Sequence, residues 1–553
     1  MENSEYKAKM QDLFAARART AMYRTDLSRP LALALAGGLV GRGQDVFDYG
    51  CGRGNDIKVL QQLGTAASGW DPYFAADSPK QPAAIVNLGY VVNVIEQPAE
   101  RAYVLREAWS LCRQVLLVAA RLDWDVSLGQ AVPHGDGLIT AKGTFQKFYE
   151  HDELRSWIES ELGTPPDAAA PGVFFVFRDA TAREGFLARA STYSAPSPRQ
   201  RITLSLDENR DLLQPLLDFL VERGRAPVAG ELPSATEIGQ RFGSIERAIR
   251  LLSHSTDASA WEKSALRRQR DLLVYLALGA LRKTPRFSAL PQDLQADIRA
   301  FFGSYTGATT LGRELLFAAG DQAAIARECA SSPIGKLTPE ALYVHVSAVA
   351  ELPVLLRVYE GCGRVLYGDV PGATLVKLRR DKPAVSFLCY PDFDEDPHPR
   401  LKETFVAELK RVRTHYKSYM DRDNPPVLHR KECFVSAEYS LRARFEALTR
   451  AEERAGLLND PLTIGTANGW NERLRQRKFV VTGHRLRKLA DDPQRPSPAA
   501  SRAASNEEGE WLPSVDARKA LRISDSELAH RREAGELTWR KNGRRFEYLV
   551  KRT

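Results

Sequence analysis

The stretch VFDYGCGRGND, residues 46–56, decides the fold of the N-terminal part of this 553-residue chain. An apolar strand, Val46 to Tyr49, stands directly before three glycines and an amphipathic helix predicted from Ile57 to Leu63. A strand, a glycine turn and a helix N-terminus form a backbone cradle for a charged or polar cofactor, because glycine permits sharp turns and close approach. The pattern predicts cofactor binding at Gly50, Cys51, Gly52 and Gly54.

Polar residues also follow the next predicted strands. Asp71 stands twenty-one residues after Gly50, at the end of the strand Ala67 to Trp70, where a carboxylate can accept hydrogen bonds from ribose hydroxyls. The segment VNLGYVVNVIE, residues 86–96, reads as a further buried strand and its turn. We expect Asn87 to contact cofactor and, with Tyr90, to act in catalysis. Alternatively, both residues only end a buried strand and precede a helix.

The glycine spacing separates two classes of cofactor. Nicotinamide dinucleotide sites carry G-x-G-x-x-G, whereas this chain has G-C-G-R-G with Asn55 at the sixth place. The form D-x-G-C-G-x-G resembles the first motif of class I S-adenosylmethionine-dependent methyltransferases. That resemblance implies that Asp48 steers the methionine end of S-adenosylmethionine and that Asp71 binds its ribose.

Several strings together resemble the family of DNA phosphorothioation-associated methyltransferases. They are RTDLSRP (24–30), VFDYGCGRGND, GWDP (69–72), VNLGYVVNVIE and GTFQKFYE (143–150), with others as far as about residue 487. The resemblance implies a Rossmann-like methyltransferase domain, a role beside bacterial DNA-backbone sulfur modification and defence, and partner proteins of that system. It does not supply a methyl acceptor.

Hydrophobic patterning predicts an α/β fold class with several parts. A Rossmann-like α/β domain over 1–190 is followed by a helical domain over 200–335 and a mixed α/β domain over 336–490. A tether rich in Pro, Ala and Ser, 491–510, leads to a small module over 511–553. A weaker helix-turn-helix pattern lies within 224–252.

The C-terminal module resembles a winged helix-turn-helix of the excisionase and MerR type. A capping box at Ser524 and Glu527 opens a helix, and strands from Leu537 to Trp539 and Phe546 to Val550 are joined through an Asn-Gly signal. Residues 513–553 hold 11 Lys and Arg against 6 Asp and Glu. This charge favours DNA over a protein-docking role, with the wing as its contact: Arg540, Lys541, Arg544 and Arg545.

The methyl acceptor is only partly constrained. No Pro-Cys dipeptide occurs, which argues against methylation of cytosine C5 and leaves transfer to a nitrogen or oxygen. Arg24, Arg29, Lys147 and Tyr149 are candidates for gripping an anionic substrate, and each is equally readable as a surface residue. Asn424-Pro425-Pro426-Val427 resembles the N/D-P-P-Y/F loop of DNA amino-methyltransferases but lacks its aromatic residue, so we expect a turn.

Acidic residues crowd into the loop from Asp392 to His398, and His429-Arg430-Lys431-Glu432 follows later. Together they could form a metal-dependent nuclease site, but no metal-ligand spacing is met. We therefore expect a capped surface turn and no metal site.

Composition indicates a cytoplasmic protein with no membrane association. The six cysteines show no paired or zinc-ligand spacing, no apolar run reaches the ~18 residues of a membrane span, and no signal peptide is visible. The leading hypothesis is a methyltransferase that acts on DNA or a DNA-bound target. The alternatives are a non-catalytic DNA-binding regulator or scaffold that retains the pocket, and an RNA or small-molecule methyltransferase.

Overall fold

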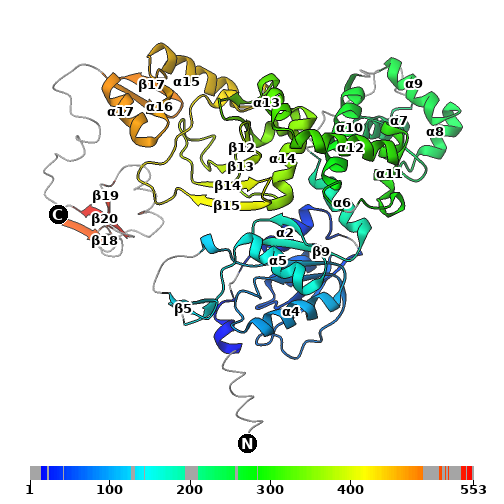
Figure 1. The fold of residues 1–553 in the computed structure, drawn as a ribbon, viewed down its shortest axis with the longest axis horizontal. Helices are drawn as coiled ribbons and strands as arrows, with labels where there is room; N and C mark the ends of the chain where they lie inside the picture. The colour runs from blue at the N-terminus through cyan, green and yellow to red at the C-terminus, as the bar shows by residue number, and fades with distance from the viewer. Residues whose placement is uncertain are drawn as a thin grey trace, which may run out of the picture. The chain divides into compact units, whose positions relative to one another are not determined.

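A computed structural model describes residues 14–21, 24–41, 43–125, 131–141, 143–192, 209–255, 259–282 and 284–489, with parts of 510–550. The chain forms two compact units, Met1–Arg487 and Lys488–Thr553. Figure 1 shows the elements coloured along the sequence. No helix in these described ranges is long and apolar enough to cross a membrane.

The N-terminal region is built on a six-stranded sheet in the order β2-β1-β3-β4-β9-β8. Strands β1 to β4 are parallel, β9 is antiparallel to β4, and β8 is antiparallel to β9. The strand order reverses at β1, which has β2 on one side and β3 on the other. The strands are β1 (Asp45–Tyr49), β2 (Ala66–Trp70), β3 (Ala83–Gly89), β4 (Cys112–Ala119), β8 (Asp167–Ala170) and β9 (Val173–Phe177).

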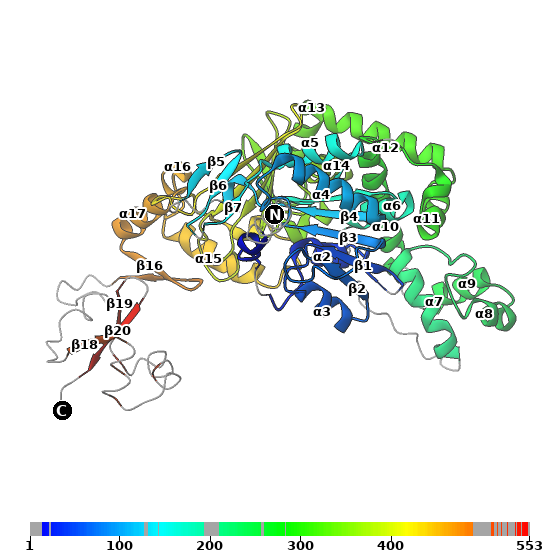
Figure 2. The same cartoon turned by 90° about the horizontal axis from the view of Figure 1, so that it is seen from below.

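Helices cover both faces of this sheet, as Figure 2 shows. Val46 and Ile85 pack against one set of helices, and their neighbours Phe47 and Val86 pack against the other, since successive strand residues point to opposite faces. The first face carries α2 (Arg29–Ala36), α3 (Asn55–Gln62) and α6 (Ala180–Ala190); the second carries α4 (Pro98–Leu111) and α5 (His151–Leu162). The predicted α/β fold of this region is confirmed, with element ends shifted by up to three residues.

A small three-stranded sheet, β5-β6-β7, is inserted between β4 and α5. Its strands follow the short 3-10 helix η1 (Asp123–Asp125), and they are β5 (Val132–His134), β6 (Gly137–Ile139) and β7 (Phe145–Gln146).

All regular structure described between residues 210 and 331 is helical. Helices α7 to α9 share one apolar cluster, and α10 to α12 share a second. The weaker helix-turn-helix pattern coincides with α8 and α9. The helices are α7 (Arg210–Arg223), α8 (Ala235–Phe242), α9 (Ile245–Ser255), α10 (Ser259–Gly279), α11 (Gln292–Phe302), α12 (Tyr305–Gly320) and α13 (Gln322–Ser331).

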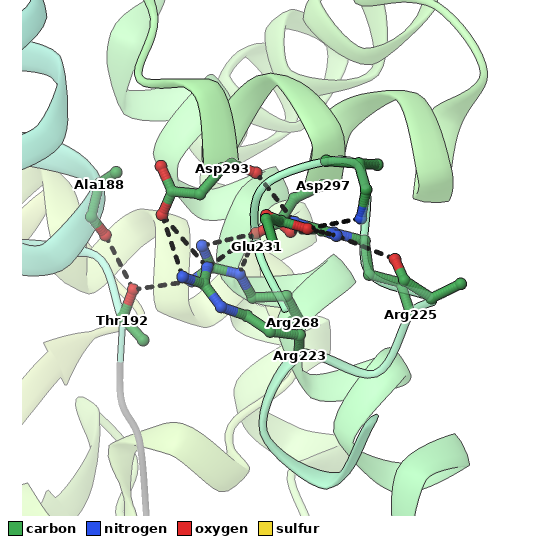
Figure 3. A network of polar contacts seen from close by, with 10 residues as sticks. Ala188, Thr192, Arg223, Arg225, Glu231, Arg268, Asp293 and Asp297 are labelled. Carbon is green, nitrogen blue, oxygen red and sulfur yellow. Dashed lines mark hydrogen bonds and ion pairs between the residues drawn. The ribbon is translucent and has the colours of Figure 1, made fainter. Parts of the chain in front are cut away.

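A buried carboxylate joins the parts of this helical region (Figure 3). Asp297 of α11 is 0% exposed and makes ion pairs with Arg225, Arg268 and, at 3.6 Å, Arg223. Arg225 also pairs with Glu231. Because every charge in this network has an opposite partner, burial of Asp297 is compensated.

The next region holds an antiparallel sheet, β10-β11-β12-β13-β14-β15, in sequence order. Helix α14 (Val354–Tyr367) packs on one face, and loops with helix α15 (Arg442–Arg454) pack on the other. Short elements α16 (Pro461–Ile464), α17 (Ala467–Arg477), β16 (Phe479–Thr482) and β17 (Arg485–Lys488) follow. The strands are β10 (Lys336–Leu337), β11 (Ala341–His345), β12 (Leu375–Arg379), β13 (Ala384–Cys389), β14 (Glu403–Glu408) and β15 (Arg413–Ser418).

This antiparallel region is joined tightly to the N-terminal region. The Asp369 amide donates to the Ala169 carbonyl at 2.8 Å, and His151 Nε2 lies 2.9 Å from the Leu366 carbonyl. Gly368 has φ +73, and a Cβ there would lie 2.2 Å from the Ala169 carbonyl carbon. Only glycine therefore permits this approach of the backbone after α14 to β8.

The second unit contains a three-stranded antiparallel sheet, β18-β20-β19, of β18 (Glu510–Pro513), β19 (Trp539–Asn542) and β20 (Arg545–Val550). Ala517, Leu528 and Tyr548 form its core. The predicted hairpin is present, but its first strand runs from Trp539 to Asn542 and not from Leu537 to Trp539, because Asn542 pairs with Arg545 in the ladder. The predicted capping pair, Ser524 and Glu527, lies outside the described residues.

Candidate functional site

The site begins where β1, β2 and β3 end side by side. The Gly50 and Cys51 amides both donate to the Trp70 carbonyl, at 2.7 and 3.1 Å, so the glycine turn is held against the end of β2. Gly50 has φ +81, and a Cβ there would lie 2.5 Å from Val91 Cγ2. A side chain at Gly50 is therefore excluded both by conformation and by space. In an open parallel sheet, ligands bind at such a reversal of strand order.

Asp71 is fixed by its own surroundings. Its Oδ2 accepts from the Gly52 amide at 3.0 Å, and its Oδ1 accepts from the amides of Tyr73 and Phe74, each at 2.9 Å. A carboxylate offers about four lone-pair directions, so roughly one remains for a ligand. The carboxylate is thus oriented in advance and can accept one more hydrogen bond without disturbing the turn.

A cavity of about 590 Å³ opens over these strand ends. Its lining includes several of the residues proposed for the site from sequence: Gly50, Cys51, Gly52, Asp71 and Tyr90. Gly54 lies instead in an adjoining cavity of about 690 Å³ that shares Gly52 and Arg53. Burial raises the pKa of the Cys51 thiol to about 12, so this residue is not a thiolate nucleophile at neutral pH.

Asp48 and Asn87 lie below the cavity and are not among its lining residues. Asn87 Nδ2 donates to Asp48 Oδ1 at 2.8 Å, and Asn87 Oδ1 is buried without a hydrogen-bond partner. Burial raises the pKa of Asp48 to about 7, and the negative charge of Asp56 adds to the effect. These two side chains form an incompletely satisfied polar pair at the ends of β1 and β3.

Tyr90 follows β3 in a strained conformation. Its φ is +63, which is unusual for a residue with a large side chain, and its amide donates to the Ala119 carbonyl at 2.7 Å. Burial raises the pKa of the Tyr90 hydroxyl, against the opposing charges of Arg29 and Arg24. Tyr90 is therefore a neutral hydrogen-bonding group that lines the cavity near these arginines.

The structure divides the four candidates for gripping an anion into two pairs. Lys147 forms ion pairs with Asp136 at 3.1 Å and Glu153 at 2.8 Å, and Tyr149 is buried. In contrast, Arg29 Nε and Nη2 are buried without hydrogen-bond partners.

Desolvation lowers the pKa of Arg29, and the opposing effects of nearby Tyr90, Asp125 and Asp369 are smaller. Arg24 lines the cavity itself. Arg24 is therefore placed to meet an incoming anion, whereas Arg29 keeps unpartnered donors but is not among the residues that line the cavity.

Sequence reasoning missed the walls of the cavity. Arg17, from the segment before α2, forms ion pairs with Glu96 at 2.7 Å and Glu100, so this segment covers one side. Lys80 Nζ lies 3.9 Å from the ring centroid of Trp70 and 2.7 Å from Glu107. The aromatic pair Tyr73-Phe74, directly after the acid of GWDP, was the visible signal for a wall beside Asp71.

The acidic loop from Asp392 to His398 is tied down by hydrogen bonds. Asp394 Oδ1 accepts from the Tyr439 hydroxyl at 2.7 Å, and Asp396 Oδ1 accepts from the His398 amide at 2.9 Å. Pro426 and Val427 of the second predicted turn form isolated bridges with Thr466 and Arg400. Neither segment contributes to the cavity.

The predicted DNA contacts lie in the second unit, on its antiparallel hairpin. Arg540 and Lys541 belong to β19, and Arg545 begins β20. Arg544 lies outside the described residues.

No protein-family model matches the chain, and no curated protein matches it. Among solved structures, a 1,6-didemethyltoxoflavin N1-methyltransferase of Burkholderia thailandensis, with bound S-adenosylhomocysteine, is 14% identical, with TM-score 0.22, over 32% of this chain and 89% of that one. A sugar N-methyltransferase from Streptoalloteichus is 14% identical, with TM-score 0.22, over 32% of this chain and 92% of that one.

An S-adenosylmethionine-bound amino pentose methyltransferase of Micromonospora echinaspora gives 12% identity and TM-score 0.21 over 30% of this chain and 94% of that one. Scores of this size do not determine an activity, so the chemistry has to come from the residues of the site.

Proposed function

We propose that the N-terminal region, residues 1–190, is an S-adenosylmethionine-dependent methyltransferase. The cavity over the ends of β1, β2 and β3 carries this proposal, because it joins a glycine turn, an oriented carboxylate and aromatic walls in one place. Its volume of about 590 Å³ lies within the roughly 300–1,000 Å³ range of small-molecule sites.

The residues present fit the three parts of this cofactor. Tyr73 and Phe74 would border the adenine, and the remaining lone pair of Asp71 would accept from a ribose hydroxyl. The glycine turn from Gly50 to Gly52 would lie along the methionine part. Asp48 acts from below as a positioning residue, through Asn87 and through its charge.

The bound cofactor supplies an electrophilic methyl group to a nitrogen or oxygen acceptor. The chain contributes by holding that acceptor in line, which can provide a large part of a rate enhancement. Tyr90 is the candidate for orienting the acceptor, because its hydroxyl keeps its proton at neutral pH and so donates a hydrogen bond. Arg24 and Arg29 would hold an anionic substrate beside it.

We further propose that this substrate is DNA, or a target bound on DNA, in a phosphorothioation-linked system. Three features support this: the family resemblance of the sequence, the partner-free guanidinium atoms of Arg29, and the excess of positive charge in residues 513–553. In this proposal the last module is a winged helix-turn-helix that delivers DNA through its wing.

The experiment measures transfer of tritiated methyl to plasmid DNA with and without phosphorothioate, and to total RNA. We expect label on DNA with the wild-type chain and with the control variant Asp77→Ala. Asp77 is an exposed aspartate six residues after Asp71. We expect at least a tenfold loss with Asp71→Ala. Cofactor binding without label on either nucleic acid would contradict the DNA proposal and favour a regulator or a small-molecule methyltransferase.

The role of the C-terminal module is tested separately. A chain ending at Gly509 should lose DNA affinity in gel-shift titrations while retaining cofactor binding. Undiminished DNA affinity in this shortened chain would refute the DNA-binding role of the module.

A further inference from the structure

Two histidines and a glutamate meet in the antiparallel region, far along the chain from the cofactor site. His398 lies in the loop between β13 and β14, His429 lies before the 3-10 helix η5 (Lys431–Cys433), and Glu452 belongs to α15. One potential ligand atom of each lies within 4.8 Å of the other two. The side chains are almost completely enclosed, with exposures of 7%, 9% and 1%.

The hydrogen bond of His429 determines which of its ring nitrogens is free. Its Nε2 lies 2.8 Å from the carbonyl oxygen of Ile464, and a carbonyl can only accept, so Nε2 carries the proton. Nδ1 of His429 is then an unprotonated acceptor, and it is buried without a partner. Histidines that bind metals are oriented in this way, with the other ring nitrogen donating to a carbonyl or carboxylate.

The contact between His398 and Glu452 also lacks a stabilising group. His398 Nε2 lies 2.8 Å from Glu452 Oε1, yet Glu452 Oε1 has no hydrogen bond of acceptable geometry. Two electron-rich atoms this close need either a shared proton or a cation between them. No Lys or Arg in the described ranges lies within ion-pair distance of Glu452.

The nearest cations are committed elsewhere. Lys431 Nζ donates to the carbonyl oxygens of Phe393 and Asp396, at 2.6 and 2.7 Å, and lies 2.9 Å from His484 Nε2. Arg430 pairs with Glu453. Neither of these two residues therefore forms an ion pair with Glu452.

The imidazole rings are held in place by an aromatic wall. The Trp470 ring lies 4.4 Å from the His398 ring and 4.6 Å from the His429 ring, between centroids. This packing restricts both rings to a narrow range of orientations, which is the preorganisation that a metal site requires.

We propose that His398, His429 and Glu452 bind one divalent transition-metal ion, and that this ion is Zn²⁺. Imidazole nitrogen and carboxylate oxygen are ligands that zinc accepts in a three-residue set with a fourth position for water. Ligand atoms around zinc lie about 3–4 Å apart, so the cluster needs to close by about an ångström at its widest separation.

The ion would add a further link between three segments that already share hydrogen bonds and the Arg430–Glu453 ion pair. One precedes β14, one precedes η5, and one is helix α15. Its binding free energy would add to the stability of the region that ends the first unit, because the unfolded chain does not present these ligands together.

The test uses the full-length chain without a histidine tag, produced in zinc-supplemented medium and freed of loose metal by gel filtration. Metal content is measured by inductively coupled plasma mass spectrometry, which reports every transition metal at once. We expect about one zinc per wild-type chain and at least a tenfold loss in Glu452→Gln, which keeps the shape of the side chain. His345→Gln is the matched control, since His345 is also buried in this region but bonds to Ser347.

A second measurement does not depend on the folding of any variant. The unfolding temperature of the wild-type chain should fall by several degrees after treatment with a chelator and recover when zinc is added. The proposal would be overturned if the wild-type protein contained no metal and its unfolding temperature changed with neither chelator nor zinc. His398 and Glu452 would then be a pair that shares a proton. Full zinc in Glu452→Gln would also overturn it, and iron or manganese at the same stoichiometry would overturn the choice of ion.

Discussion

Asp48 and Asp297 are both buried aspartates, but their surroundings differ. Asp297 is paired with three arginines of the helical region. Asp48 has one amide partner, Asn87, and the negative charge of Asp56 outweighs the positive charge of Arg24. The charge of Asp297 is neutralised by ion pairs, whereas the charge of Asp48 is compensated only in part and has no ion-pair partner within the described residues.

Whether a buried polar group has partners distinguishes the structural network from the candidate site. Buried polar groups in proteins are normally hydrogen-bonded, so an exception calls for an explanation. The unpartnered atoms of the N-terminal region include Asn87 Oδ1 and two nitrogens of Arg29, all near Asp48 or Tyr90. Unsatisfied groups thus occur where a ligand is proposed to bind, whereas Asp297 and the arginines around it are all paired.

The largest effect on stability is expected from breaking the ion-pair network around Asp297. Asp297→Asn should lower the free energy of unfolding by about 3–5 kcal/mol, because it leaves buried arginines without their counter-charge. Urea unfolding followed by circular dichroism would measure this. Asp293→Asn is the control and should change stability by less than ~1 kcal/mol, since Asp293 is a partly exposed partner of Arg223. Equal midpoints for Asp297→Asn and wild type would contradict the comparison.

The free energy of unfolding should depend on pH through the buried carboxyl group of Asp48. The pKa of Asp48 is raised to about 7 in the folded chain, so its contribution to stability is present at acidic pH and is lost as pH rises towards 7. Asp48→Asn cannot ionise and should be more stable than wild type at pH 8, by about 2–4 kcal/mol at ~1.4 kcal/mol per pKa unit.

The difference should shrink steadily as the pH falls from about 7 to about 4, because the folded chain then holds the proton of Asp48 while the unfolded chain still releases it. Thermal or urea unfolding from pH 4 to pH 8 would show this convergence. A constant difference across that range would mean that Asp48 does not titrate as described.

A smaller effect is expected at Asp71, whose three backbone hydrogen bonds order the turn. Asp71→Asn should weaken binding of S-adenosylmethionine by roughly 10–100-fold. This factor corresponds to the loss of one hydrogen bond to a charged group, which contributes about 1.5–3 kcal/mol. Isothermal titration calorimetry would measure the change, with Asp77→Asn as the control. Equal affinities would remove Asp71 from the cofactor site.

The smallest effect on stability is expected at Arg29. Arg29→Gln should change the free energy of unfolding by less than ~1 kcal/mol, because the guanidinium atoms that it removes have no partners to lose. Methyl transfer to an anionic acceptor should nevertheless fall at least tenfold, with cofactor affinity unchanged. Strong destabilisation with normal transfer would instead make Arg29 part of the scaffold.

The cofactor region was the most predictable part from sequence because its information is local. The run from Val46 to Asp56 contains a strand, its turn and the following helix start, and Asp71 follows at a fixed distance. The position of Arg29 beside Tyr90 could not be predicted, since it depends on how α2 packs on the sheet. Sequence reasoning did consider a metal site formed by the loop ending at His398 and the segment beginning at His429, but set it aside because no ligand spacing was met. It missed Glu452, which comes from a third segment.

The C-terminal hairpin shows a different limit of sequence reasoning. An Asn-Gly pair signals a two-residue turn, which placed the end of the first strand too early. In the structure the last paired residue of β19 is Asn542, three residues beyond the predicted end of the strand at Trp539. Local propensity identified the hairpin but not its register.

The close approach of Gly368 to Ala169 has an evolutionary consequence. A contact that tolerates no side chain ties the history of the N-terminal region to that of the antiparallel region, although they are separate along the gene. Recombination that exchanged either region alone would bring together surfaces that had not been selected to fit. The two regions are therefore expected to be inherited together, as one block.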